Sequence, residues 1–126
     1  MADRVVVLED DPADQRFLDR AVQRSGLDVE LVMCPDLFAA RDEIAATEPD
    51  LVIVDLSVPG GNGVSLIKEL RTDRPMLPTV VLTSSTAPWD HRAAIDAGAR
   101  SVHTKPFEWE AYRSLVDRTL RYWLEP

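Results

Sequence analysis

Three short apolar runs constrain the fold of this chain most, because polar side chains follow each of them at once. The runs are residues 5–8 before Glu9-Asp10-Asp11, residues 51–54 before Asp55, and residues 80–82 before Thr83-Ser84-Ser85. A short apolar run that ends at polar or turn residues is typical of a strand buried on both faces of a sheet. Parallel strands end at one edge of their sheet, where open α/β sheets bind ligands. The three runs therefore predict a polar crevice at that edge.

Runs with helical spacing separate the strands. Pro12 suits a first helical turn, Gly26 suits a helix end, and Asp36 is expected to cap a second helix. That second helix is expected to turn four apolar residues toward the core: Leu37, Phe38, Ile44 and Ala45. Further helices are expected to begin at Gly63 and near Pro88. The last helix carries an apolar stripe formed by Trp109, Tyr112, Val116, Leu120 and Trp123.

Residues 29–33 and 101–104 are weaker strand candidates, which brings the number of strand–helix units to five. Five such units predict an α/β fold, a flavodoxin-like doubly wound parallel sheet with strand order 2-1-3-4-5. Glu30 interrupts the second strand, so we expect that strand at the sheet edge. In this order the first and third strands are neighbours, and Glu9, Asp10 and Asp55 are expected to meet in one crevice.

Composition limits the class of protein. The chain has 126 residues, which suits one domain over residues 1–126. Its net charge of −8 argues against binding to a nucleic-acid backbone, and equally against docking on an anionic membrane. Cys34 is the only cysteine, so no disulfide can form within the chain, in keeping with a reducing compartment. No apolar run approaches the ~20 residues of a membrane span and no signal peptide precedes the first strand, so we expect a cytoplasmic protein.

The predicted crevice has the composition of a metal site that handles phosphate. Carboxylates at neighbouring strand ends repel one another unless a cation lies between them. A small carboxylate cluster that leaves room for water suits Mg²⁺. Lys105 adds an ammonium group and Thr83 a hydroxyl group, which can offset and hydrogen-bond the oxygens of a phosphoryl group. We therefore expect a magnesium-dependent site in which an aspartate receives a phosphoryl group.

Four motifs in this order resemble those of response-regulator receiver domains, and the resemblance extends over nearly the whole chain. The motifs are Leu8-Glu9-Asp10-Asp11, Val54-Asp55-Leu56-Ser57-Val58-Pro59-Gly60, Leu82-Thr83-Ser84 and Lys105-Pro106-Phe107. The resemblance implies that Asp55 is the phosphoacceptor. It also implies four metal ligands: Asp10 directly, Glu9 through water, Ser57 through its backbone carbonyl, and Asp55 itself. Thr83 and Lys105 are implied to contact the phosphoryl group.

The same resemblance implies a sensor histidine kinase as the phosphodonor and no turnover of a substrate. We expect no output domain after the receiver, so the signal is expected to leave through protein contacts. Asp14 and the segment Tyr122-Trp123-Leu124-Glu125 resemble single-domain regulators that work with bacterial phytochrome-type kinases. Apolar surface is expected to remain exposed on the last helix, which favours a homodimer through the fourth helix, fifth strand and fifth helix. The alternative is that these aromatic side chains pack on the domain's own core.

The chain departs from the receiver pattern at two positions. Glu9 replaces the usual aspartate, a change that preserves metal binding. Val102 stands where receivers usually carry a Tyr or Phe that swings inward on phosphorylation, which leaves open a phosphorylation-silent receiver acting as a constitutive interaction module. Another alternative is a haloacid-dehalogenase-like phosphoaspartate hydrolase. Such enzymes carry an Asp-x-Asp motif after this strand, whereas here Ser57 occupies the position of the second aspartate. A flavodoxin is disfavoured because no phosphate loop rich in Ser, Thr and Gly follows the first strand.

The Lys105–Pro106 peptide bond is predicted to be cis. A tight strand-to-helix turn at this point must aim the lysine ammonium back into the crevice. The tertiary amide of proline lowers the cost of the cis form to about 0.5–1 kcal/mol.

Overall fold

The computed structural model describes residues 2–58 and 63–124, in which five strands alternate with five helices. The elements are β1 (Asp3–Leu8), α1 (Pro12–Ser25), β2 (Val29–Cys34), α2 (Leu37–Thr47), β3 (Leu51–Val54), α3 (Gly63–Asp73), β4 (Thr79–Thr83), α4 (Pro88–Ala97), β5 (Ser101–Thr104) and α5 (Trp109–Leu124). Pro59 and Gly60 of the sequence motif lie outside the described residues.

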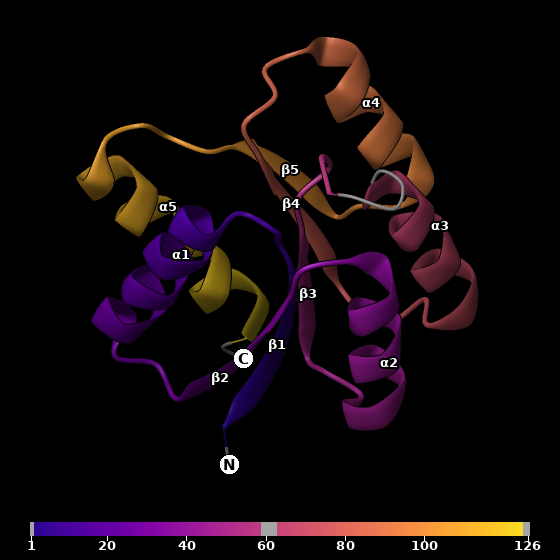
Figure 1. Cartoon of the computed structure of the whole chain (residues 1–126), viewed down its shortest axis with the longest axis horizontal. Coiled ribbons are helices and arrows are strands. Elements are labelled where there is room, and N and C mark those ends of the chain that lie inside the picture. The colour runs from indigo at the N-terminus through magenta and orange to yellow at the C-terminus, as the bar shows by residue number, and fades with distance from the viewer. Residues whose placement is uncertain (1, 59–62, 125–126) are drawn as a thin grey trace.

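The strands form one parallel sheet of order β2-β1-β3-β4-β5, as the sequence predicts (Figure 1). β2 lies at an edge, which confirms the prediction made from Glu30. Leu8 at the end of β1 is opposite Val54 at the end of β3, and the backbone N–H of Asp55 donates to the Leu8 carbonyl at 2.9 Å. This register brings the residues that follow the two central strands, Glu9 and Asp55, to the same point of the sheet edge.

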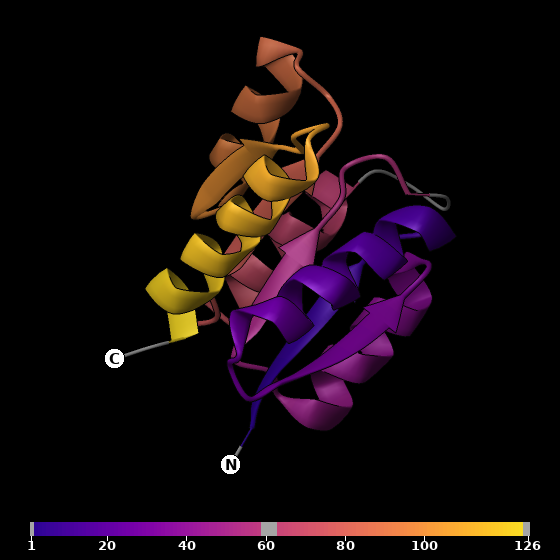
Figure 2. The same cartoon turned by 90° about the vertical axis from the view of Figure 1, so that its left-hand side faces the viewer.

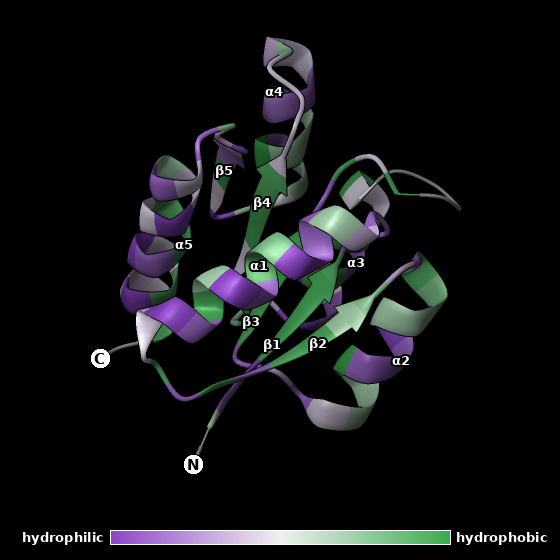
Figure 3. Ribbon diagram, turned by 60° about the vertical axis from the view of Figure 1, so that its left-hand side comes forward, coloured by the Kyte–Doolittle hydropathy of each residue, from purple (hydrophilic) through white to green (hydrophobic). Residues whose placement is uncertain are grey.

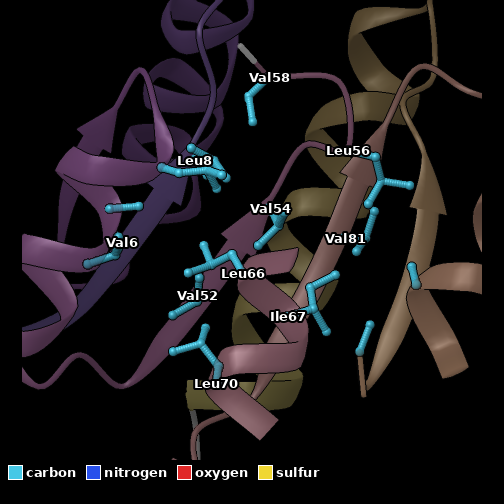
Figure 4. Close-up of a cluster of buried hydrophobic side chains, with 14 of the residues drawn as sticks. Val6, Leu8, Val52, Val54, Leu56, Val58, Leu66, Ile67, Leu70 and Val81 are labelled. Atoms are coloured by element: carbon cyan, nitrogen blue, oxygen red, sulfur yellow. The ribbon is translucent and has the colours of Figure 1, made fainter. Parts of the chain in front are cut away.

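Helices cover both faces of the sheet. α1 and α5 lie side by side on one face, and α2, α3 and α4 cover the other (Figures 1 and 2). Successive residues of a strand point to opposite faces, so each buried strand contributes to two cores. On the α3 face, strand residues such as Val52 and Val54 pack with Leu66, Ile67 and Leu70 (Figure 4). The core on the other face contains further strand residues and the buried part of the α5 stripe, namely Val5, Val7, Ile53, Tyr112, Val116 and Leu120.

The hydropathy pattern follows this layering (Figure 3). The central strands are hydrophobic over most of their length, whereas α1 and α5 alternate between hydrophobic and hydrophilic residues. A sheet covered on both faces by amphipathic helices requires this combination.

Pro12, Gly26 and Asp36 mark helix ends as the sequence predicts, and Asp11 adds a cap that was not predicted. The Asp11 side chain accepts a hydrogen bond from the Ala13 N–H at 2.8 Å and caps α1, and the Asp36 side chain accepts one from the Ala39 N–H at 2.9 Å and caps α2. Gly26 ends α1 with φ of 73°, a left-handed conformation that glycine adopts without steric cost.

One part of the predicted core is wrong. Phe38 is 75% exposed and Ala45 is also exposed, although both were expected to face the core. α2 buries Leu37, Ala40 and Ile44, which lie three and four residues apart and so share one face of the helix. Phe38 follows Leu37 directly and is therefore turned about 100° away from that face.

None of the helices in the described part of the chain is both long enough and apolar enough to span a lipid bilayer.

Candidate functional site

Three carboxylates surround one lysine at the carboxyl edge of the sheet. The Lys105 ammonium, just after β5, donates to Glu9 Oε2 at 2.6 Å, to Asp14 Oδ2 at 2.9 Å and to Asp55 Oδ2 at 2.9 Å. Glu9 follows β1, Asp55 follows β3, and Asp14 lies in the first turn of α1. A lysine ammonium has three N–H donors, so each of them is used by a different carboxylate.

This cluster is largely shielded from water. The side chains of Glu9, Lys105 and Asp55 are 5%, 9% and 11% exposed, and that of Asp14 is 30% exposed. Burial raises the pKa of Glu9 to about 7, although the hydrogen bonds from Lys105 and the Asp11 N–H oppose this. Burial also opposes the charge of Lys105, but its hydrogen bonds to the three carboxylates outweigh that cost and raise its pKa above the usual range. The lysine is therefore a permanent cation of the site.

Backbone groups orient the two most buried carboxylates. Asp55 Oδ1 accepts from the Ser57 N–H at 3.0 Å, so the two oxygens of Asp55 have different partners. Glu9 Oε1 accepts from the Asp11 N–H at 3.1 Å, and the Gln15 side chain donates to the Glu9 carbonyl at 2.6 Å. The loops after β1 and β3 thus hold both carboxylates toward the same ammonium.

Thr83 ends β4 beside this cluster and is fully buried. Its hydroxyl oxygen accepts a hydrogen bond from the Ser85 N–H at 3.2 Å. Lys105 continues the pairing of β4 with β5, because its backbone N–H donates to the Thr83 carbonyl at 2.7 Å. Val102 is opposite Val81 and packs against the core on the α3 face, so a small aliphatic side chain occupies this position of β5.

The prediction of a cis Lys105–Pro106 bond is wrong, since no peptide bond in the described residues is cis. Lys105 reaches the three carboxylates with a trans bond. Its backbone remains paired with Thr83 beyond the end of β5, and this pairing already directs the side chain into the crevice. The chain therefore does not need to reverse at this peptide bond.

The structure brings together Glu9, Asp55 and Lys105 from the predicted site, but it gives Asp10 a different position. Asp10 is exposed and lies outside the group of carboxylates whose oxygens are within 4.8 Å of one another. The third member of that group is Asp14, which was named from the sequence only for its resemblance to regulators paired with phytochrome-type kinases and was not placed in the site. The sequence did contain a signal that Asp14 belongs to the site. Asp14 is four residues beyond Asp10, in the first turn of a helix that starts beside the crevice.

The donor set fits a hard divalent cation. Glu9, Asp14 and Asp55 each offer a carboxylate oxygen in close proximity, and oxygen ligands of this kind suit Mg²⁺. In the described structure Lys105 provides the positive charge that the carboxylates require. A metal can therefore bind if some of these carboxylates turn to the ion while the others stay with the lysine.

An aromatic cluster borders the site on the side of Asp14. The rings of Phe17, Trp109 and Tyr112 lie with centroids 6.1 to 6.4 Å apart, which joins the second turn of α1 to the first turn of α5. A cavity of about 300 Å³ lies between these rings, Lys105 and Asp14. Burial raises the pKa of Tyr112, so this phenol is neutral at physiological pH.

Comparison with known proteins agrees with this architecture. The family model of the response regulator receiver domain matches residues 5–117. The KDP operon transcriptional regulatory protein KdpE of Escherichia coli (strain K12) is 37% identical over 103 residues, which cover 82% of this chain and 44% of that protein. The response regulator MprA of Mycobacterium bovis is 34% identical over 123 residues, 94% of this chain and 53% of that protein. The chain thus spans about half the length of these curated relatives.

Solved structures of similar fold include phosphorylated RcpA, a cyanobacterial phytochrome response regulator. Its TM-score is 0.89 at 25% identity, with 99% of this chain and 96% of that chain covered. The Mn(2+)-bound response regulator Rcp1 gives a TM-score of 0.85 at 26% identity, covering 98% and 95%. Receiver domains are phosphoacceptor signalling modules and not turnover enzymes, so the hydrolase alternative is excluded. The chain belongs to the response regulator receiver domain family of two-component systems.

Proposed function

We propose that Asp55 accepts a phosphoryl group from a sensor histidine kinase in a magnesium-dependent reaction, in the cytoplasm. The observation that supports this most directly is the contact of Asp55 Oδ2 with the Lys105 ammonium at 2.9 Å. It puts a cation beside the one carboxylate that ends the central strand β3. An ammonium in this place can offset the charge of phosphoryl oxygens that approach Asp55.

In the proposed reaction an Asp55 oxygen attacks the phosphorus atom and forms the new P–O bond. The P–N bond to the phosphohistidine of the kinase breaks, and the imidazole leaves with the electron pair and takes up a proton. Lys105 stays protonated and interacts with the transferred oxygens. The hydroxyl group of Thr83 turns from the Ser85 N–H and donates to one of these oxygens.

Four residues are proposed to hold the metal: Asp10 directly, Glu9 through water, Asp55, and Ser57 through its backbone carbonyl. Asp10 suits this role because, among the described residues, no other side chain pairs with its exposed carboxylate. The ion supplies positive charge that balances the carboxylates and the oxygens of the phosphoryl group.

A phytochrome-type kinase is the proposed phosphodonor. The relatives RcpA and Rcp1 are response regulators of similar fold, and RcpA is a phytochrome response regulator. Phosphotransfer profiling against the sensor kinases of the source organism tests this choice, and rapid transfer from kinases of another class alone would contradict it.

Output through protein contacts is proposed to include a homodimer through α4, β5 and α5. Large apolar side chains are exposed on two of these elements: Trp89 and Ile95 on α4, and Tyr122 on α5. Sedimentation at tens of micromolar with and without beryllofluoride, a mimic of the phosphoryl group, tests the dimer. A monomer in both states would contradict it.

A silent receiver is the second candidate, and the observation that favours it is Val102. An aliphatic side chain at this position offers no aromatic ring that could move with Thr83. The silent candidate predicts binding to a partner that is independent of phosphorylation.

Incubation with acetyl phosphate and Mg²⁺ separates the two candidates. The wild-type protein is expected to gain the mass of one phosphoryl group, and hydroxylamine is expected to remove it. Asp55→Asn should abolish the gain, whereas the matched control Asp42→Asn, on the exposed face of α2, should leave it unchanged. A wild-type protein that gains no mass, or a phosphate on another residue, would overturn the assignment.

A further inference from the structure

We propose that Asp14 is a positioning residue that holds the Lys105 ammonium beside Asp55 during phosphoryl transfer. This inference rests on the proposed function of Asp55. The carboxylate of Asp14 lies 2.9 Å from the lysine nitrogen, the same distance as Asp55. Asp14 is therefore as close a partner of Lys105 as the phosphoacceptor itself.

The local structure fixes Asp14 in this place. Asp11 caps α1 and Pro12 begins it, so Asp14 is the third helical residue, where the helix dipole favours a carboxylate. One turn further along, Phe17 packs against Trp109 and Tyr112 of α5. The cap and this packing fix the first turn of α1 relative to the segment that carries Lys105.

The reaction gives Asp14 a role that Glu9 and Asp55 cannot fill. Asp55 forms a bond to phosphorus, and both Asp55 and Glu9 belong to the proposed metal site. These two carboxylates must therefore divide their oxygens between the metal, the phosphoryl group and the lysine. Asp14 is the remaining carboxylate that can keep hold of the ammonium. Without it, a flexible side chain with four methylene groups loses one of its three partners.

A competing effect acts in the other direction, because the negative charge of Asp14 repels an anionic phosphoryl group. Coulomb energy falls with distance. The Lys105 ammonium is 2.9 Å from both Asp14 and Asp55, so the cation shared by the two carboxylates offsets the repulsion between them. The attraction of Asp14 to Lys105 therefore exceeds its repulsion of groups bound to Asp55, and removal of Asp14 is expected to slow the reaction.

The test measures the phosphorylation rate with acetyl phosphate at saturating Mg²⁺ for Asp14→Asn, Asp14→Glu, Lys105→Ala and the double variant Asp14→Asn/Lys105→Ala. Asp14→Asn should lower the maximal rate about tenfold, since small displacements of a positioned group cost up to about a hundredfold. The half-saturating donor concentration and the Mg²⁺ affinity should stay within about twofold of wild type. Asp14→Glu, which retains the carboxylate, should recover part of the rate.

The double variant shows whether Asp14 acts through the lysine. In the Lys105→Ala background, Asp14→Asn should cost less than about twofold, because its partner is already absent. The matched control is Asp19→Asn, on the same helix, where the carboxylate pairs with Gln23; it should leave the rate unchanged.

Three outcomes would overturn the inference alone: a wild-type rate in Asp14→Asn, an undiminished loss in the Lys105→Ala background, or a loss of Mg²⁺ affinity as large as the loss of rate. The last outcome would make Asp14 a metal ligand. A wild-type protein that takes up no phosphoryl group would instead refute the proposed function, and the inference with it.

Discussion

Replacement of Gly63 by alanine tests whether close packing behind the site positions Asp55. Gly63 is the first residue of α3, is buried, and donates its N–H to the Leu56 carbonyl at 3.1 Å. An added Cβ would overlap the Val54 side chain and would lie 2.7 Å from the Asp55 carbonyl oxygen and 3.3 Å from Leu56 Cα. Two of these atoms belong to the backbone that presents Asp55, so the clash is relieved only if that segment moves.

The expected cost follows from this geometry. Overpacking by one methyl group against atoms that cannot rotate away costs about 1–3 kcal/mol. The higher helix propensity of alanine offsets little of this, because Gly63 is at the helix end and not in its interior. The unfolding entropy of about 2.1 cal/mol/K per residue gives ~0.26 kcal/mol/K for this chain. Gly63→Ala is therefore expected to lower Tm by roughly 4–11 °C.

Differential scanning calorimetry measures the loss of stability, and the phosphorylation rate with acetyl phosphate measures the displacement of Asp55. The matched control is Gly26→Ala at the end of α1, where an added Cβ meets nothing within 4 Å but φ is 73°. Left-handed strain should lower its stability by about 1–2 kcal/mol and leave phosphorylation unchanged. Gly63→Ala should slow phosphorylation as well. A wild-type Tm for Gly63→Ala, or a lower Tm with a wild-type phosphorylation rate, would refute the reasoning.

Three further outcomes are expected. In calorimetric titrations Asp10→Ala should weaken Mg²⁺ binding more than Glu9→Gln, because a direct ligand contributes more than one acting through water; equal losses would contradict the proposed roles. Burial and the charge of Arg118 lower the pKa of His103 in the folded protein, so the unfolded chain protonates this imidazole more readily. The stability of the fold should therefore decrease as pH falls from about 6.5 through the folded-state pKa. Urea unfolding of His103→Gln should show a smaller loss over that range, and a wild-type pH profile would argue against this. Cys34 is 1% exposed and burial raises its thiol pKa to about 11, so a thiol reagent should label it only as the chain unfolds, and rapid native labelling is the contrary result.

The amino-acid sequence by itself determined the elements and their order in the sheet. Apolar runs identify β1, β3 and β4, because a strand segment covered on both faces carries mainly apolar residues. Asp11, Gly26 and Asp36 mark helix ends through contacts with atoms only a few residues away. Such signals are local, so they can be read from the chain. They also predicted that Glu9 and Asp55 meet, since the strand order makes β1 and β3 neighbours.

Tertiary structure alone decided which side chains share the ammonium of Lys105. Asp14 is 91 positions from Lys105 in the sequence and pairs with it only because α1 packs beside α5, the helix that follows Lys105. The same holds for the trans bond before Pro106, which accompanies the pairing of the Lys105 backbone with β4. It also holds for the exposure of Phe38, which depends on the face that α2 packs against the sheet. Helical periodicity predicts that one face of a helix is buried. A shift of that face by one residue, however, changes which side chains are buried. The distances between elements far apart in the chain are set only when the helices pack on the sheet. The same packing sets the rotation of each helix about its own axis.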